Sequence, residues 1–391
     1  MIVFIESNTS GTGEYYYKLC KKKKLEFIFL VRKPKKYSWL EKKYYKVINT
    51  DDVSKIFKYL RNLNKTSKIK FILSTSDNYI LTSNKLNKLM KISYENLKNF
   101  EVLKNKFKCL NKMKKYNLVN RYYFLYSQKK INSINYPCIV KPNSGTGSIN
   151  VYKIYNKDQL IKKINLIKKS KVNDILVDEF VKGEEYSLEI LFFNKKIIFS
   201  QIIKKFINDT EHFVESGHLI SPDNQNHLKY IENKILKKIK KFNFNLTFLH
   251  IEFKIDKNLD IQIIEINPRL AGGFIPILIK YCFKIDLINF YLDLIFKKNS
   301  HIKKIKNTNF YKIFFLIPNK SKKIKKVSMI NSINDLILEK KIYRDKLKSF
   351  SKIMYNFQDR IGHVILKSRT IKKLSKKESF IKSKIKYIYE Q

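Results

Sequence analysis

The chain has few residues that interrupt regular structure or cross-link a fold, and it has no long apolar run. Its 391 residues include nine glycines, seven prolines, one tryptophan and four cysteines. The cysteines form no CxxC pair and have no histidine-rich neighbourhood, which argues against a disulfide framework and a zinc site: Cys20, Cys109, Cys138 and Cys282. No run approaches the roughly 18 apolar residues of a membrane span, and MIVFIESNTS lacks the basic and cleavable parts of a signal peptide. We therefore expect a soluble protein of the reducing cytoplasm with no membrane partner.

Acidic residues are also scarce, with 33 Asp and Glu against 82 Lys and Arg, for a net charge of +49. Such an excess is typical of proteins that bind nucleic acid or anionic surfaces. The lysines lie along nearly every segment, however, together with much isoleucine, asparagine, phenylalanine and tyrosine. This distribution favours a drift in composition, so we expect no specific nucleic-acid partner. In this background the surviving glycines mark strand ends and loops where only glycine fits: Gly11, Gly13, Gly145, Gly147, Gly183, Gly217, Gly272, Gly273 and Gly362.

Three units follow from the order of strand and helix patterns. Residues 1–100 alternate strand-like runs such as IVFIE, LEFIFLV and KFILST with helical stretches, which predicts a doubly wound parallel sheet of the α/β class. An amphipathic helix over 101–119 would lead into a second unit, 101–296, whose adjacent strand patterns predict antiparallel pairing and an α+β fold that ends in a long helix. A basic linker then leads to a third unit, 297–391. The segment SNTSGTG has one GxG but no following Lys-Ser/Thr, and it is interpreted as a tight strand-to-helix turn.

The segment HIEFKIDKNLDIQIIEINPRLAGG, residues 250–273, carries the strongest chemical signal. Two apolar strands joined by a short turn would place Glu252 and Glu265 on neighbouring strands about 5 Å apart, with Asn267 on the same face. Two crowded carboxylates repel each other unless a hard cation joins them, and magnesium prefers such oxygen ligands. The pattern therefore predicts a magnesium site. The alternative is a polar strand end with exposed acids.

Two further segments suggest nucleotide binding. Lys141 ends the short strand CIVKP, and the glycine-rich loop around Ser144, Gly145, Gly147 and Ser148 follows it, so backbone amides and an ammonium could meet phosphate oxygens. In DILVDEFVKGEEYSLEI, backbone groups near Phe180 and Val181 could pair with an adenine edge, and a carboxylate could hold ribose hydroxyls. Taken alone, this second segment is also compatible with a charged hairpin.

Together these residues resemble the ATP-grasp superfamily, and more narrowly its carboxylate–amine ligases of the L-amino-acid-ligase branch. MIVFIESNTSGTGE resembles the branch's N-terminal pre-ATP-grasp domain, KNKFKCLNKM its entry lysine segment and FQDRIGHVI its C-terminal closing motif. The step of thirteen residues from Glu252 to Glu265 is similar to the family's metal pair. The resemblance covers nearly the whole chain. It implies a pre-ATP-grasp domain at 1–100, an ATP-grasp domain at 101–296 with a lid at about 122–181, and a C-terminal subdomain at 297–391.

The resemblance also implies roles for single residues. Lys106 and Lys141 would hold the ATP phosphates under the loop from Ser144 to Ser148. Asp178 and Val181 would lie at the adenine hinge, although the family usually has Glu where Asp178 stands, and Glu185 would bind the ribose. The metals would be held by Glu252, Glu265 and Asn267. Arg269 would hold the acyl phosphate or the substrate carboxylate, the amides of Gly272 and Gly273 would face the oxyanion, and His218 in ESGHLISP would line the substrate side. A purely structural histidine is the alternative for His218.

The activity implied by the resemblance is an ADP-forming ligation. ATP and two magnesium ions, or manganese in their place, would serve to activate a small carboxylate as an acyl phosphate and join it to an amine, in a chain compatible with a homodimer. The nearest alternative is a primary-metabolism member of the purine-pathway or carboxylase type. A further alternative is a catalytically idle, basic protein that binds nucleic acid.

Overall fold

The computed structural model describes most of the chain. The described residues are 1–9, 11–92, 95–126, 134–145, 147–207, 213–223, 225–256, 259–296, 301–318, 324–329, 335–343 and 360–389. Within them, no helix is both long enough and apolar enough to cross a membrane. All four cysteines are buried and free.

The N-terminal unit is a parallel sheet with helices on both faces. Its strands lie in the order β3-β2-β1-β4: β1 (Ile2–Ile5), β2 (Phe27–Val31), β3 (Tyr45–Val47) and β4 (Phe71–Leu73). Alternate residues of β1 face opposite cores. Ile2 and Phe4 pack with α1 (Thr12–Lys22), whereas Val3 and Ile5 pack with α2 (Val53–Thr66) and α3 (Ile80–Leu89). The predicted doubly wound sheet is therefore confirmed.

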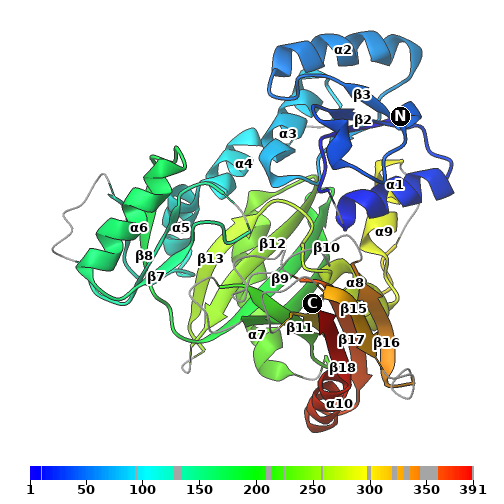
Figure 1. Cartoon of the computed structure of the whole chain (residues 1–391). Coiled ribbons are helices and arrows are strands. Elements are labelled where there is room, and N and C mark those ends of the chain that lie inside the picture. Colours follow the sequence, from blue (N-terminus) through cyan, green and yellow to red (C-terminus); the bar gives the residue numbers. More distant parts are fainter. Residues whose placement is uncertain are drawn as a thin grey trace.

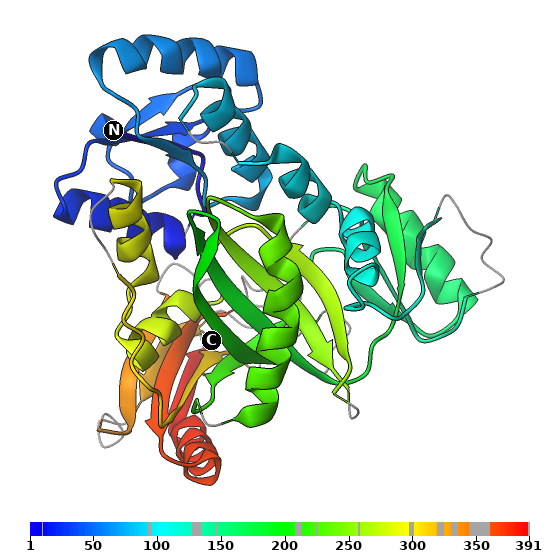
Figure 2. The same ribbon diagram turned by 180° about the vertical axis from the view of Figure 1, so that it is seen from behind.

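A small antiparallel sheet projects to one side of the molecule (Figures 1 and 2). Its strand order is β5-β8-β6-β7, with α6 (Lys157–Lys169) packed against it: β5 (Tyr123–Leu125), β6 (Cys138–Pro142), β7 (Tyr152–Ile154) and β8 (Ile175–Glu179). The sheet carries Lys141 at the end of β6 and Asp178 on β8, which pairs with β6.

The largest element is an eight-stranded antiparallel sheet in the order β13-β12-β9-β10-β11-β14-β17-β16. Its strands are β9 (Glu184–Phe193), β10 (Lys196–Ile207), β11 (Glu215–Ile220), β12 (Leu246–Ile255), β13 (Ile261–Asn267), β14 (Phe310–Leu316), β16 (Ile337–Ile342) and β17 (Gly362–Ser368). The pairing of β11 with β14 carries the sheet across residue 297, where the sequence suggested a new unit. The remaining C-terminal elements are α10 (Ile371–Ser383) and the paired strands β15 (Ile324–Met329) and β18 (Ile385–Tyr389). The antiparallel α+β prediction is confirmed.

Two predictions of a single helix were wrong, because in each case the backbone breaks and a side chain caps a second helix. The helix expected over 101–119 is two helices, α4 (Leu97–Lys104) and α5 (Lys106–Lys114), because Asn105 is extended and its side chain caps α5 by accepting from the Lys108 amide. The long helix expected after the metal segment is also two, α8 (Ile275–Phe283) and α9 (Leu287–Ile295). Lys284 in the left-handed conformation ends α8, and Asp286 caps α9. The break at Asn105 places Lys106 at the first turn of a helix.

The two faces of the large sheet differ. Helices α4, α5 and α7 (Asn226–Ile239) cover one face, and Figure 2 shows α7 lying across it. On the other face, α8 and α9 pack over Leu191, Ile203 and Phe248. On each of these strands, the next residue toward the same end of the sheet that faces this side is charged: Glu189, Lys205 and His250. Helices α8 and α9 therefore cover only the apolar part of this face, and a row of polar side chains begins where they end.

Candidate functional site

The predicted metal residues lie on adjacent strands at the edge of the large sheet. Glu252 on β12 and Glu265 on β13 are direct register partners, so their side chains share a face, and a β-bulge follows Glu252. Asn267 donates to Glu265 Oε1 at 2.7 Å. The predicted grouping of these three residues on one face agrees with the register.

The donor set suits a hard divalent cation. It consists of two carboxylates and an amide oxygen, which are ligands that magnesium and manganese accept. Lysine ammonium groups lie against both acids: Lys205 Nζ is 3.0 Å from Glu252 Oε1, and Lys106 Nζ is 3.2 Å from Glu265 Oε2. Across the described residues, no three side chains of the His, Cys, Asp and Glu types are grouped as a metal site. Asn267 stays the predicted third ligand, and a set of three would leave coordination positions for phosphate and water.

Lys205 is the centre of a buried cluster that the sequence did not reveal. Its ammonium lies 2.9 Å from Glu185, 3.0 Å from Glu252 and 3.1 Å from Glu215. Burial lowers the pKa of Lys205, but the three glutamates outweigh it and hold the pKa well above its usual value. Lys205 is therefore a fixed positive charge on the polar face.

His250 is a second cation that the sequence did not reveal. Its Nδ1 lies 2.7 Å from Glu189 and its Nε2 lies 2.9 Å from Glu252. Burial lowers the pKa of His250, yet Glu189 and Glu252 raise it to about 10. Burial also raises the pKa of Glu252, whereas Lys205 and His250 lower it strongly overall. The polar face is thus a row of charged groups of alternating sign.

On the small sheet, Lys141 and Asp178 are paired and buried. Lys141 Nζ lies 2.8 Å from Asp178 Oδ2, and Arg121 binds the same carboxylate through Nε at 2.7 Å and Nη2 at 3.0 Å. The Asp178 side chain is thus occupied by two cations. The hinge role of Asp178 stays a prediction.

Lys106 joins the glycine-rich loop to Glu265, one of the predicted metal ligands. Besides Glu265, its ammonium reaches the carbonyl oxygen of Gly145 at 2.8 Å. The start of α5 is tied to the end of β6, since the amides of Lys106 and Phe107 donate to the backbone and side-chain oxygens of Asn143. Lys106 therefore lies beside the loop that follows Lys141, as expected. Ser144, Gly147 and Ser148 lie in the same loop, and Thr146 is outside the described residues.

The predicted hinge segment runs from β8 to β9 past Phe180 and Val181. Gly183 has φ +125°, and a β-carbon there would lie 2.3 Å from the carbonyl oxygen of Ile255, so only glycine fits against β12. The Val181 carbonyl accepts from Lys254 Nζ at 3.1 Å. Glu185, two residues after Gly183, pairs with Lys205 and lies on the same face as Glu252.

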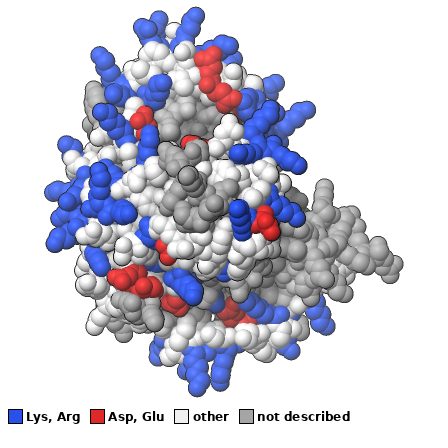
Figure 3. Space-filling view, turned by 90° about the vertical axis from the view of Figure 1, so that its left-hand side faces the viewer, with Lys and Arg blue, Asp and Glu red and all other residues white. Residues whose placement is uncertain are grey.

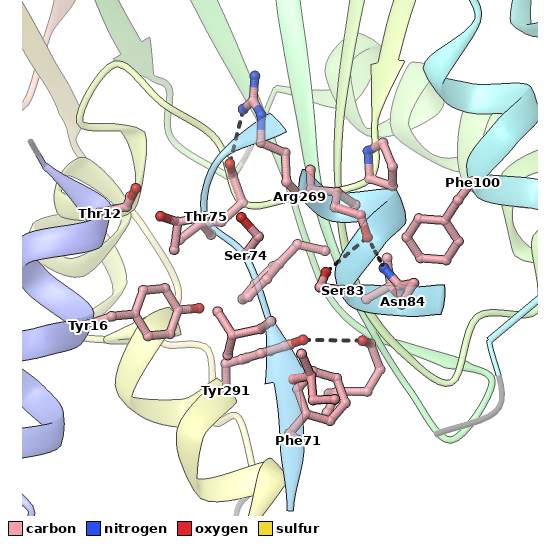
Figure 4. Close-up of a pocket in the computed structure, with 18 residues that line it drawn as sticks. Thr12, Tyr16, Phe71, Ser74, Thr75, Ser83, Asn84, Phe100, Arg269 and Tyr291 are labelled. Atoms are coloured by element: carbon pink, nitrogen blue, oxygen red, sulfur yellow. Dashed lines mark hydrogen bonds between the residues drawn. The ribbon is translucent and has the colours of Figure 1, made fainter. Parts of the chain in front are cut away.

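Arg269 is tied to the N-terminal unit. Its Nε donates to Asp77, which also pairs with Lys104. Burial lowers the pKa of Arg269, but Asp77 raises it overall, so the charge is fixed. A small cavity of about 60 Å³ lies beside Arg269, between Thr12, Ser74, Thr75 and Tyr291 (Figure 4). A cavity of this size holds a water molecule or two and not a nucleotide.

The glycine pair precedes α8, as expected. Within the described part of the chain, neither the Gly272 nor the Gly273 amide donates to a protein acceptor. A β-carbon at Gly273 would lie 2.6 Å from His218 Nε2, so His218 packs directly behind this turn. His218 is fully buried, and neither ring nitrogen has a hydrogen-bond partner among the residues that the structure describes. Burial lowers the pKa of His218 to about 4, so the ring is neutral at pH 7.

Several functional candidates escaped the sequence analysis: Arg121, Asp77, Glu189, Lys205, Glu215 and His250. A usable signal existed for the acids of β9, since Glu185, Ser187 and Glu189 alternate with apolar residues and so share one face. His250 stands two residues before Glu252 in the same way. Lys205 had no such signal, because it is one of many lysines.

Comparisons with known proteins agree with this geometry. A family model described as an ATP-grasp domain matches residues 134–277. A D-alanine–D-alanine ligase from Buchnera aphidicola subsp. Schizaphis graminum is 34% identical over 131 residues, which cover 32% of this chain and 41% of that protein. The match thus spans about two fifths of that relative.

Solved structures agree over the whole fold. An L-amino acid ligase from Bacillus licheniformis has a TM-score of 0.81 at 13% identity, with 100% of this chain and 98% of that one covered. The biotin carboxylase domain of 2-oxoglutarate carboxylase from Hydrogenobacter thermophilus, a dimer in complex with MgADP and bicarbonate, has a TM-score of 0.70 at 11% identity, with 100% and 91% covered. At such identities these likenesses describe the fold alone. Residues 134–277 thus match an ATP-grasp domain, and the whole chain shares the fold of the solved L-amino acid ligase.

Proposed function

We propose that the protein is an ADP-forming ligase that activates a small carboxylate with ATP and joins it to an amine. The observation that carries the proposal is the register pairing of Glu252 with Glu265, beside Asn267, on the charged face of the large sheet. Lys106 links this face to the glycine-rich loop, which brings phosphate-binding groups and metal ligands together. This combination is what transfer of a phosphoryl group requires.

Different residues would bind the phosphates, the adenine and the ribose of the nucleotide. Lys106, Lys141 and the loop from Ser144 to Ser148 would bind the phosphates, backbone groups from Asp178 to Val181 the adenine, and Glu185 the ribose. Glu252, Glu265 and Asn267 would hold two magnesium ions, which supply positive charge at the transferring phosphate. The Hydrogenobacter domain, named as a complex with MgADP, supports this choice of nucleotide and metal.

The reacting carboxylate would lie beside Arg269. Asp77 and the Leu270 carbonyl hold two of the guanidinium nitrogens, so Arg269 is oriented before any substrate arrives. An oxygen of the substrate carboxylate would attack the γ-phosphorus and displace ADP. The neutral amine would then attack the carbonyl carbon of the acyl phosphate, displace phosphate and lose a proton. The amides of Gly272 and Gly273 would stabilise the oxyanion of that second step.

The test is a screen for nucleotide turnover. Purified protein with Mg²⁺ and ATP is offered panels of carboxylic acids and amines, including amino acids, and ADP, AMP, phosphate and diphosphate are quantified. ADP and phosphate should form only when an acid and an amine are both present, and the Glu252→Gln, Glu265→Gln double variant should be inactive. Turnover driven by bicarbonate or formate would favour the primary-metabolism alternative. If the double variant turned over ATP as fast as the wild type, the proposed metal site would be contradicted.

A further inference from the structure

The turn before α8 has an unusual backbone. Gly273 and Phe274 both adopt the left-handed conformation, with φ of 58° and 59°. Glycine adopts it freely, whereas a residue with a side chain is disfavoured by a factor of roughly 5 to 30 in population. Phe274 must therefore be held in place by its surroundings.

The Phe274 ring is held by side chains of the C-terminal strands. Its centroid lies 4.6 Å from the centroid of the His363 ring on β17 and 5.6 Å from that of the Tyr343 ring. The Phe274 and Tyr343 rings stack with an angle of 14° between their planes. Aromatic contacts at these distances are favourable beyond the area that they bury. The ring of Phe315 on β14 lies 6.4 Å away and completes the enclosure.

His363 is fixed at both nitrogens. The Tyr343 hydroxyl lies 2.6 Å from Nδ1, and Glu339 Oε1 of β16 lies 2.9 Å from Nε2. Glu339 also accepts from the hydroxyl of Tyr281 on α8 at 2.8 Å. Tyr343 and Glu339 thus hold the His363 ring through both of its nitrogens. His363 itself is fully buried.

The other residue of the turn, Gly273, is confined as well. Gly273 packs against His218, with no room for a side chain between them. The turn is thus confined by His218 at Gly273 and by the ring contacts of Phe274. The position of Phe274 consequently decides where the neighbouring amides point.

We infer that His363 is a positioning residue for this turn. By holding the Phe274 ring, it keeps Gly273 and Phe274 left-handed and so directs the amides of Gly272 and Gly273. The inference rests on the proposed function, in which these amides stabilise the oxyanion. His363 lies on β17 and acts through Phe274 alone.

The test compares His363→Ala with Leu366→Ala. Leu366 is also fully buried on β17 but packs in a different cluster, so its variant controls for lost stability. His363→Ala should lower kcat by about 10- to 100-fold, the range expected when a catalytic group is misplaced, while KM for ATP changes less than about twofold. Leu366→Ala should lower the melting temperature and leave kcat near that of the wild type. If His363→Ala keeps the wild-type kcat, the inference is wrong. Should that variant fail to fold, His363→Phe keeps a ring and removes both hydrogen bonds.

A double-variant cycle separates positioning from general damage. Phe274→Gly removes both the ring and the disfavoured backbone conformation, so adding His363→Ala to it should change kcat by less than about twofold. Equal losses in both backgrounds would show that His363 does not act through Phe274. Amide hydrogen exchange across residues 272–277 needs no activity: it should quicken in His363→Ala and not in Leu366→Ala. If the wild type turns over no ATP, the proposed function fails while exchange still decides the inference, and unchanged exchange refutes it.

Discussion

Lys141 and Asp178 form a buried ion pair between strands β6 and β8, with 2.8 Å between the ammonium nitrogen and a carboxylate oxygen. Arg121 binds the same carboxylate from the chain that enters the small sheet. Burial raises the pKa of Asp178, but Lys141 and Arg121 lower it overall, so the group is charged. The pair fixes the direction of the lysine that we assign to the ATP phosphates.

Replacing Lys141 with alanine should therefore have two effects. Loss of the cation should weaken ATP binding by at least about tenfold, which corresponds to 1.4 kcal/mol. It also leaves Asp178 with one buried partner instead of two, and unpairing a buried charge completely costs about 3–5 kcal/mol, so a smaller loss of stability is expected. Calorimetric ATP titration and thermal denaturation measure the two separately. Lys169→Ala, at an exposed position of α6, is the matched control. Near-normal ATP affinity in Lys141→Ala would show a purely structural lysine.

The metal assignment predicts how Mn²⁺ binds. In the presence of a non-hydrolysable ATP analogue, the wild type should bind two ions per chain, counted by electron paramagnetic resonance of free Mn²⁺. Glu265→Gln should weaken this binding and lower kcat by at least about 100-fold. Without the bound metal ions, the negative charge of the transferring phosphate would not be neutralised. Asp260→Asn makes the same chemical change at an exposed residue between β12 and β13 and should behave as the wild type. Two tightly bound ions in Glu265→Gln would contradict the assignment.

His218 should make stability depend on pH. Burial lowers its pKa from 6.5 to about 4, so between these values the unfolded chain binds a proton here and the folded chain does not. The free energy of unfolding should then fall as the pH falls from 6.5 to 4, by up to about 1.4 kcal/mol per pH unit. In His218→Asn this part of the slope should vanish, as urea denaturation at several pH values would show. His227→Asn changes an exposed histidine on α7 and should keep the full slope.

The sequence predicted the parts of the fold and site that depend on local pattern. The alternating strands gave the facing of Glu252 and Glu265, and Gly183 stood out because so few glycines remain. What it missed depends on distant partners. Lys205 gains its importance from three glutamates on three different strands, and nothing in its neighbourhood along the chain marks it among the other lysines. The break at Asn105 went unnoticed because the apolar spacing continues through it, while the capping side chain decides the backbone.

The positive charge should be incidental to function. Figure 3 shows lysine and arginine side chains scattered over one face with acids between them, rather than gathered in a single groove. Binding to duplex DNA or RNA at physiological salt should then be non-specific and weak, with Kd of about 10⁻⁴ to 10⁻⁶ M or poorer. Fluorescence anisotropy with several unrelated sequences measures this. Nanomolar, sequence-selective binding would instead support the nucleic-acid alternative.

The route of the phosphoryl group can be traced with isotopes. Glu265, which pairs with Glu252 in register and accepts from Asn267, lies beside Lys106, on the side of the site assigned to the terminal phosphates, so attack should occur at the γ-phosphorus and release ADP. The attacking atom is an oxygen of the substrate carboxylate. When the amine displaces phosphate from the acyl phosphate, that oxygen leaves with the phosphorus. With an ¹⁸O-labelled carboxylate, one label should therefore appear in the released phosphate, as read by ³¹P NMR. Attack at the α-phosphorus would place the label in AMP, and that result would rule out the acyl phosphate.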